Sequence, residues 1–192
     1  VTIMVNPAPL TNNVDQIVCS TSPGGSTYTE NLIALQPAVN ADGTLTFSWH
    51  TSQADALANI NAMTVGTASA YPLANGIPVF VRVSNGTCAR IQAVTYTVNP
   101  SPSVTAAITS NYNGAQLSCN TSSNGIITVT PPTNGTAPYL YSIDGGSSFF
   151  TSTTFNGLSA SGNPYVVRVR DARGCIADSP PLNFVAPPAL TA

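Results

Sequence analysis

The sequence predicts an all-β protein with two tandem antiparallel β-sandwich domains and a short helix in the first. Proline-rich phrases recur at the start, middle and end of the chain, about one small domain apart: "VNPAPLT" (5–11), "TVNPSPSVT" (97–105) and "VAPPALT" (185–191). "PVFVRVSNGTC" (78–88) and "PYVVRVRDARGC" (164–175) each run from an alternating strand through a turn to a cysteine. Because one plan occurs twice, the chain divides into two domains.

The proline phrases set the expected domain bounds. We expect a sandwich at residues 7–100 and a second one at 101–187. Residues 1–6 are interpreted as the trailing strand or linker of a preceding repeat, and residues 188–192 as the start of the next linker, so the chain reads as a piece of a longer array. Pro100 and Pro102 are expected to hold the linker at 99–103 extended, with the domains end to end.

Polar and apolar residues alternate with a period of two in six segments: 44–50, 78–84, 91–98, 125–131, 139–143 and 165–170. Clusters of Gly, Asn, Pro and Ser separate them, which is typical of short antiparallel strands in a sandwich. "YSIDGGSSFF" (141–150) predicts a hairpin, because glycine supplies the positive φ of a tight turn. Trp49 is the predicted core residue of the first domain, with Phe47 on the same strand face.

One segment, "SQADALANINAM" (52–63), departs from the strand pattern. It contains good helix formers and no β-branched run, so we expect a short helix with Ser52 or Asp55 at its start. The apolar stripe of this helix would comprise Ala56, Leu57, Ile60 and Met63.

Charged residues make up only 6% of the chain, lysine is absent, and the net charge is −2. The absence of a basic patch argues against a nucleic-acid partner. No apolar run approaches the length of a membrane span, which argues against membrane insertion. Serine, threonine and asparagine supply the polarity instead, as in many secreted β-proteins.

Four cysteines divide two per domain, and we predict the disulfides Cys19–Cys88 and Cys119–Cys175. This pairing places the protein in an oxidising compartment. The alternatives are four buried thiols or a metal site; the sequence has no CxxC, and its one histidine is far from every cysteine in sequence, so we expect no metal and no cofactor.

No catalytic constellation is visible, and we expect no enzymatic activity. His50 is interpreted as an exposed or hydrogen-bonded surface residue of its strand. Asp144 is assigned to a plain hairpin turn rather than to calcium, because the alternating acids of a calcium loop are missing. Asp171 is expected to serve its turn or to pair with an arginine. Arg168 and Arg170 are expected to form a solvated face, with their stems covering apolar neighbours.

Three N-x-S/T sequons occur, at Asn85, Asn120 and Asn134, which agrees with the abundance of these residue types and would permit glycosylation in a eukaryotic source. Without lysine, the chain cannot form the lysine–asparagine cross-links that lock some bacterial surface domains.

Residues 134–175 contain "YSIDGG", "FNGL" and "VRDARGC" in an order that resembles the SprB repeat of giant gliding adhesins of Bacteroidota. Residues 10–98, with "FSWHTSQADALANI" before "FVRVSNGTC", resemble the companion Ig-like repeats of the same secreted proteins. The resemblance implies Ig-like sandwiches in a cell-surface filament that is attached to the outer membrane and exported by type IX secretion. It implies no catalytic residues.

We therefore expect a non-catalytic repeat segment of a secreted adhesin or surface filament that supports adhesion or gliding motility. Its expected partners are neighbouring repeats of the same chain and a surface polysaccharide or other surface ligand. One alternative is a carbohydrate-binding module whose aromatic side chains stack on sugars: Tyr139, Tyr141, Phe149 and Phe150. Another is an accessory module of a secreted hydrolase.

Overall fold

A computed structural model describes residues 7–189 of the chain, which form two compact units. The division falls between Asn99 and Pro100, and the short segment Ser22–Gly25 is counted with the second unit. The expected trailing strand at 1–6 and residues 190–192 of the expected exit linker lie outside the described residues. Independent folding of 7–100 and 101–187 and their end-to-end arrangement stay predictions.

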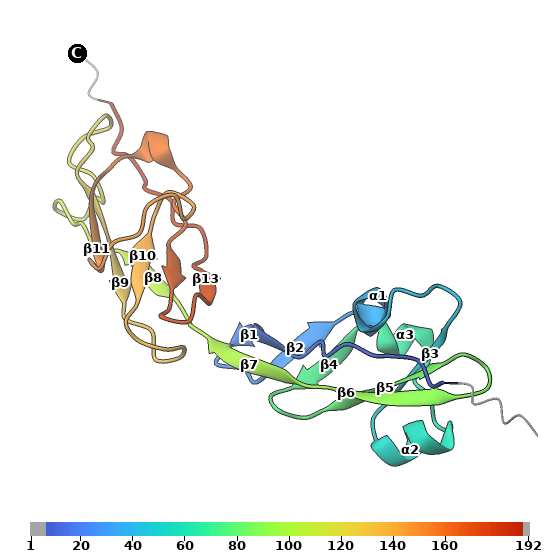
Figure 1. Cartoon of the computed structure of the whole chain (residues 1–192). Coiled ribbons are helices and arrows are strands. Elements are labelled where there is room, and N and C mark those ends of the chain that lie inside the picture. Colours follow the sequence, from blue (N-terminus) through green and yellow to red (C-terminus); the bar gives the residue numbers. More distant parts are fainter. Residues whose placement is uncertain (1–6, 190–192) are drawn as a thin grey trace, which may run out of the picture. The chain divides into compact units, whose positions relative to one another are not determined.

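From residue 7 onward, the first unit contains seven strands (Figure 1). They pair as β3-β5-β6, β2-β4 and β1-β7. The first two sheets are antiparallel. The strands are β1 (Gln16–Pro23), β2 (Thr27–Glu30), β3 (Thr46–His50), β4 (Tyr71–Ala74), β5 (Val79–Ser84), β6 (Ala89–Val94) and β7 (Tyr96–Ser101).

The pair β1-β7 differs from the predicted antiparallel pattern. The N–H of Gln16 donates to Thr95 O at 3.3 Å, and the N–H of Gly24 donates to Ser101 O at 2.9 Å. Both partners advance together along the chain, so β1 and β7 run in the same direction.

The core of the first unit forms around Trp49, which is 2% exposed. Phe47, two residues earlier on the same face, packs against this core, as predicted. Tyr96 is fully buried, and its hydroxyl donates to Glu30 Oε2 at 2.8 Å. Burial, with the bond to Glu30, raises the pKa of Tyr96. The core of the first unit therefore contains the hydrogen bond from Tyr96 to Glu30 as well as apolar contacts.

The predicted helix is present as α2 (Gln53–Ala58), with Ser52 as its cap. The Ser52 hydroxyl accepts the N–H of Asp55 at 3.1 Å. The predicted apolar stripe is wrong in part: Ala56 is buried, but Leu57 and Ile60 are 66% and 53% exposed. The helix is only six residues long and ends before Ile60, because Asn59 adopts a left-handed conformation (φ 55°).

Three further helical turns of the first unit were not predicted: η1 (Leu32–Leu35), α1 (Gln36–Val39) and α3 (Val65–Ala68). Asn31 caps the first, accepting the N–H groups of Ile33 and Ala34. Each is only four residues long, which is too short for a helical period to appear in the sequence.

Two three-stranded antiparallel sheets form the second unit, β8-β9-β11 and β10-β12-β13, with one core between them (Figure 1). The prediction of a tandem Ig-like all-β fold is therefore confirmed. The elements are β8 (Thr105–Ile108), β9 (Gly125–Thr130), β10 (Leu140–Ser142), β11 (Thr154–Leu158), η2 (Ala160–Gly162), β12 (Arg168–Arg170) and β13 (Ile176–Asp178).

The predicted hairpin at 141–150 is also present. Tyr141 and Phe150 exchange two backbone hydrogen bonds of 2.8 Å, and Gly145 and Gly146 have φ values of 75° and 95°. Asp144 closes the turn by accepting the Ser142 hydroxyl at 2.6 Å, so its role as a turn residue is confirmed.

The predicted linker at 99–103 is part of the folded structure. Asn99, Pro100 and Ser101 complete β7, and Pro102 is buried. A methyl group added at Gly135 would lie 3.2 Å from Pro102, so this segment packs closely inside the second unit. Between residues 7 and 189, no helix combines the length and apolar character that a membrane span requires.

Candidate functional site

The cysteines differ from both predicted pairs. Cys19, in the middle of β1, and Cys175, directly before β13, are each disulfide-bonded. Cys88 and Cys119 are thiols. The predicted bonds Cys19–Cys88 and Cys119–Cys175 are therefore both wrong in this structure.

Strand geometry explains why Cys19 and Cys88 do not pair. Gln16 lies beside Thr95 and Gly24 beside Ser101, and β1 runs in the same direction as β7, so Cys19 lies level with the residues between Tyr96 and Val98. Cys88 comes ten residues before Val98, ahead of β6. At about 3.3 Å per strand residue, the two cysteines are roughly 30 Å apart along the domain. A disulfide requires Cα atoms within about 7 Å.

Cys119 and Cys175 lie at opposite ends of the second unit. Cys119 precedes the start of β9, next to a loop that Asn124 ties together by accepting the N–H of Ser118. Cys175 belongs to the turn that is bonded to Thr136, which follows the end of β9. The six residues of β9 separate these ends by about 20 Å. The sequence repeat predicted a disulfide within each domain, and it does not show that Cys119 and Cys175 lie this far apart.

Asp171 holds the turn that positions Cys175. Its side chain is 5% exposed. One oxygen, Oδ1, accepts the N–H groups of Arg173 (2.9 Å) and Cys175 (2.8 Å), while Oδ2 accepts the N–H of Thr136 at 2.9 Å. The expected turn role of Asp171 is confirmed, and Cys175, which is fully buried, is fixed by the same carboxylate.

The four aromatic residues that were candidates for sugar stacking do not form one platform. Tyr141 is 3% exposed and belongs to the core, and burial raises its pKa. Tyr139 packs against that core, and its hydroxyl donates to Asn134 O at 3.0 Å. The ring of Phe149 is covered by the guanidinium of Arg170 at 4.1 Å, and only Phe150 is more than half exposed. The proposed ligand-facing role of Tyr141 is wrong, because alternation along β10 turns its ring inward.

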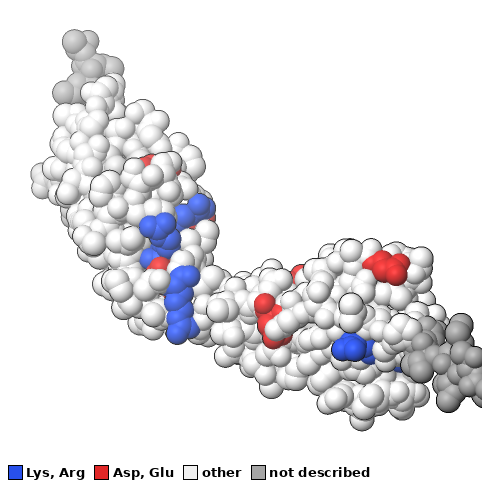
Figure 2. All heavy atoms as spheres, viewed as in Figure 1, with Lys and Arg blue, Asp and Glu red and all other residues white. Residues whose placement is uncertain are grey.

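Basic side chains gather on one face of the second unit (Figure 2). They are Arg168, Arg170 and Arg173, because the unit contains no other basic residue. Arg168 and Arg170 are both half-exposed on this face, and both also have protein partners. Arg168 forms an ion pair with Asp178 at 2.7 Å, and Arg170 lies on Phe149. Sequence reasoning missed Asp178, although the register of β12 with β13 places it opposite Arg168.

His50 is fully buried, so its expected surface position is wrong. Its ring nitrogens lie 2.9 Å from Ser48 Oγ and 2.9 Å from Ile60 O, and the expected hydrogen bonding is present. Burial follows from the α2 loop, which covers the end of β3. Among residues 7–189, no cluster of three or more His, Cys, Asp or Glu side chains is arranged to hold a metal ion.

The three sequons lie in loops. Asn85 and Asn120 are exposed, and Asn134 is half-buried. Asn85 serves its own turn, accepting the N–H groups of Thr87 and Cys88 through its side-chain oxygen. This bonding agrees with the interpretation of the motif as ordinary turn composition.

Tandem Ig-like β-units with disulfide-bonded cysteines define a class of modular extracellular protein. Residues 15–102 match the family model described as "Flavobacterium inter-domain disulphide bond domain", and residues 111–148 match that of the SprB repeat. The two matches support an SprB-type repeat region of Bacteroidota, as the sequence motifs indicated. Domains of these two families belong to extracellular surface proteins.

No curated protein sequence matches the chain. Among solved structures, it is similar to domains A168–A170 from titin, with a TM-score of 0.25 and 12% identity over 74% of this chain and 55% of that one. It is also similar to the N-terminal four Ig domains of Dscam1 isoform 6.9, with a TM-score of 0.28 and 11% identity over 95% and 47%. The chain spans about half the length of each, and the TM-scores are too low to define the fold, which rests on the sheets described above.

Proposed function

We propose that the chain is a non-catalytic, load-bearing segment of an adhesin attached to the outer membrane, in which one disulfide joins two consecutive domains. The observation that carries this proposal is the state of the cysteines. Cys19 and Cys175 are disulfide-bonded, whereas Cys88 and Cys119 are thiols. The first of the matched families is described by an inter-domain disulphide bond.

With two bonded cysteines and two thiols in the chain, Cys19 and Cys175 are the partners we propose for each other. Cys19 belongs to the first domain, which matches the disulphide-bond family, and Cys175 belongs to the SprB domain that follows. The bond then joins the domains directly, without relying on the short connection after β7.

This bond would change how the segment carries tension. Cys19 and Cys175 are 156 positions apart. Force applied at the two termini would pass through the sulfur–sulfur bond and bypass the residues between them. At about 3.5 Å per extended residue, the bond hides roughly 500 Å of chain from stretching. A surface filament with such segments keeps its length when its domains unfold under load.

Single-molecule stretching of the chain from its termini tests the proposal. The oxidised protein should show no unfolding extension from residues between the two cysteines, and reduction or Cys19→Ser should release roughly 500 Å of hidden length. Cys119→Ser, which removes an exposed thiol, is the matched control and should behave as the parent protein. Full extension of the oxidised parent would contradict the load-bearing role.

Peptide mapping tests the pairing itself. Under native, non-reducing conditions, Cys119 should be alkylated because its thiol is exposed, whereas Cys19 and Cys175 should react only after reduction. A proteolytic digest should contain one cross-linked peptide with Cys19 and Cys175. A cross-link between Cys19 and Cys88 would contradict the proposal.

Adhesion or gliding, type IX export, and contact with neighbouring repeats or a surface polysaccharide belong to the same proposal. The SprB match supports the link to gliding at the cell surface.

A further inference from the structure

The charges of the second unit are confined to one sheet and its two turns. The opposite sheet, β8-β9-β11, carries no charged residue. Charged residues make up only 6% of the chain, and those of the second unit lie on the side of the β10-β12-β13 sheet. The outer face of this sheet is therefore the charged face of the unit. The six charged residues are Asp144, Arg168, Arg170, Asp171, Arg173 and Asp178.

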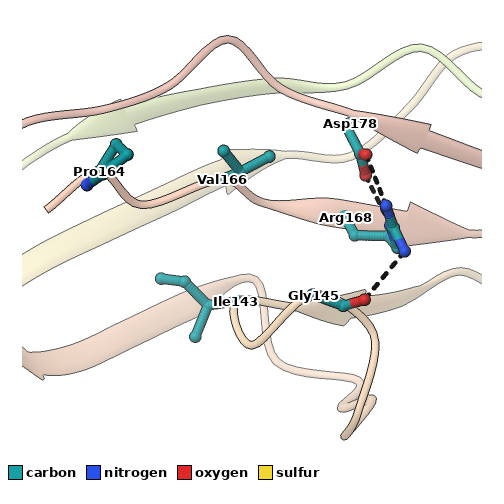
Figure 3. A pocket seen from close by; sticks show the side chains of 6 residues that line it. All are labelled: Ile143, Gly145, Pro164, Val166, Arg168 and Asp178. Carbon is teal, nitrogen blue, oxygen red and sulfur yellow. Dashed lines mark hydrogen bonds and ion pairs between the residues drawn. The ribbon is translucent and has the colours of Figure 1, made fainter. Parts of the chain in front are cut away.

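A groove of about 340 Å³ opens on this face. Its apolar part is formed by Ile143, Pro164 and Val166, and its polar part by Arg168 and Asp178 with the backbone of Gly145 (Figure 3). The volume lies at the lower end of the range for small-molecule sites. Figure 3 shows the Arg168 guanidinium lying between Asp178 and the turn that carries Gly145.

The ion pair has hydrogen-bonding capacity to spare. Arg168 uses Nε and Nη2 to bind the two oxygens of Asp178 at 2.7 Å, and Nη1 to bind Gly145 O at 2.9 Å. A guanidinium has five N–H donors, so two of them have no partner among these bonds. Each carboxylate oxygen of Asp178 likewise has room for a second donor. Donors and acceptors therefore lie side by side on a rigid pair.

The charges of this pair select the ligand. Arg168 lowers the pKa of Asp178 by hydrogen bonding to it, which keeps the carboxylate ionised. The two charges cancel, and the rest of the groove is uncharged. An anion would meet the Asp178 carboxylate together with Arg168, so a phosphate or sulfate group is a poor fit. A neutral ligand with adjacent hydroxyl groups fits well, because each hydroxyl both donates and accepts.

We propose that this groove binds a neutral saccharide. Two adjacent hydroxyl groups would bond to Arg168 and Asp178, and the C–H face of the sugar ring would pack on Ile143, Pro164 and Val166. This inference rests on the proposed role at the cell surface, and it makes the SprB domain a sugar-binding element as well as a mechanical one. The aromatic residues expected to stack on sugars play no part in it.

Titration of the ¹⁵N-labelled chain with neutral monosaccharides and short neutral oligosaccharides, followed by NMR, tests the proposal. At least one neutral sugar should shift the Arg168 Nε–H signal and the amides of Val166 and Asp178. Inorganic phosphate should not shift them. If no neutral sugar shifts these signals, or if phosphate shifts them equally, the proposal is overturned.

Variants locate the site. Arg168→Gln should weaken binding about tenfold or more, because it removes charge-assisted hydrogen bonds. Val166→Trp, which fills the groove and leaves the ion pair in place, should abolish binding. Arg170→Gln is the matched control, on the same strand and face but outside the groove, and should bind as the parent does.

Equal weakening by Arg168→Gln and Arg170→Gln, or normal binding by Val166→Trp, would overturn the site assignment. None of these three variants changes Cys19 or Cys175, so the stretching response should be unchanged. Failure of the sugar site and failure of the load-bearing role are thus separate results.

Discussion

Replacing Asp171 should destabilise the second unit selectively. In Asp171→Ala, the N–H groups of Cys175, which is fully buried, and Thr136, which is half-buried, lose their acceptor. Each such loss costs about 1–3 kcal/mol. The N–H of Arg173 belongs to an exposed residue and regains water. We therefore expect a total loss of about 2–6 kcal/mol in the free energy of unfolding.

Asp171→Asn gives a graded comparison. Its carbonyl oxygen can still accept the two N–H groups that Oδ1 accepts, but its NH₂ group replaces Oδ2 and faces the N–H of Thr136. One bond is lost instead of three, so we expect a smaller loss, about 1–2 kcal/mol. The free energy of unfolding should therefore decrease from the parent to Asp171→Asn and further to Asp171→Ala. This order is expected of a carboxylate that accepts three hydrogen bonds.

Urea unfolding of the reduced protein measures both losses. Hydrogen exchange in β12 follows the second unit. Trp49, the chain's one tryptophan, lies in the first unit and provides a fluorescence signal that should stay at the parent midpoint. The reasoning is refuted if both variants cost less than about 1 kcal/mol, the average effect of any substitution. It is also refuted if the Trp49 signal moves equally.

Three further substitutions test other contacts. Tyr96→Phe should cost the first unit about 1.5–3 kcal/mol in chemical unfolding, since it removes the hydroxyl bonded to Glu30; an unchanged midpoint would contradict that contact. Ser142→Ala should raise the carboxyl pKa of Asp144, measured by NMR titration. The Ser142 hydroxyl, with the N–H of Ser148, lowers that pKa to about 2 in the folded protein. The ionised Asp144 therefore stabilises the folded state at pH values above its unfolded pKa near 4, and this stabilisation is lost as the pH falls towards 2. A pKa that stays near 2 in Ser142→Ala would contradict this cause. Ser52→Ala should cost about 1 kcal/mol by removing the cap of α2, whereas Ser52→Gly should cost only a few tenths.

The sequence predicted those parts of the fold whose side chains face a single environment. The alternation around Trp49 placed β3 correctly, and the Asp-Gly-Gly turn after Asp144 placed the hairpin. It did not predict the burial of His50, because that burial depends on the segment after α2, whose Ile60 carbonyl lies against the His50 ring. It also missed Asp178, the partner of Arg168, which is set by strand register rather than by spacing along the chain.

The cysteine pairing was wrong for a different physical reason. The repeat places equivalent cysteines in equivalent turns, and this similarity favoured two self-contained domains. Disulfide formation depends on distance in space, and the shared direction of β1 and β7 puts Cys19 far from Cys88. The alternation of polar and apolar residues does not show whether two strands run parallel or antiparallel, so the sequence did not show that Cys19 and Cys88 are far apart.

The scarcity of basic residues has a consequence for survival outside the cell. A trypsin-like protease cuts only after lysine or arginine, and this chain offers it five positions. Four of them lie within hydrogen-bonded strands β5, β6 and β12, and β5 and β12 are the middle strands of their sheets. The fifth, Arg173, lies in the turn that Asp171 holds closed. Such enzymes need an extended, accessible segment, so digestion must wait for local unfolding. The folded chain should therefore persist among secreted proteases that would degrade a lysine-rich surface protein.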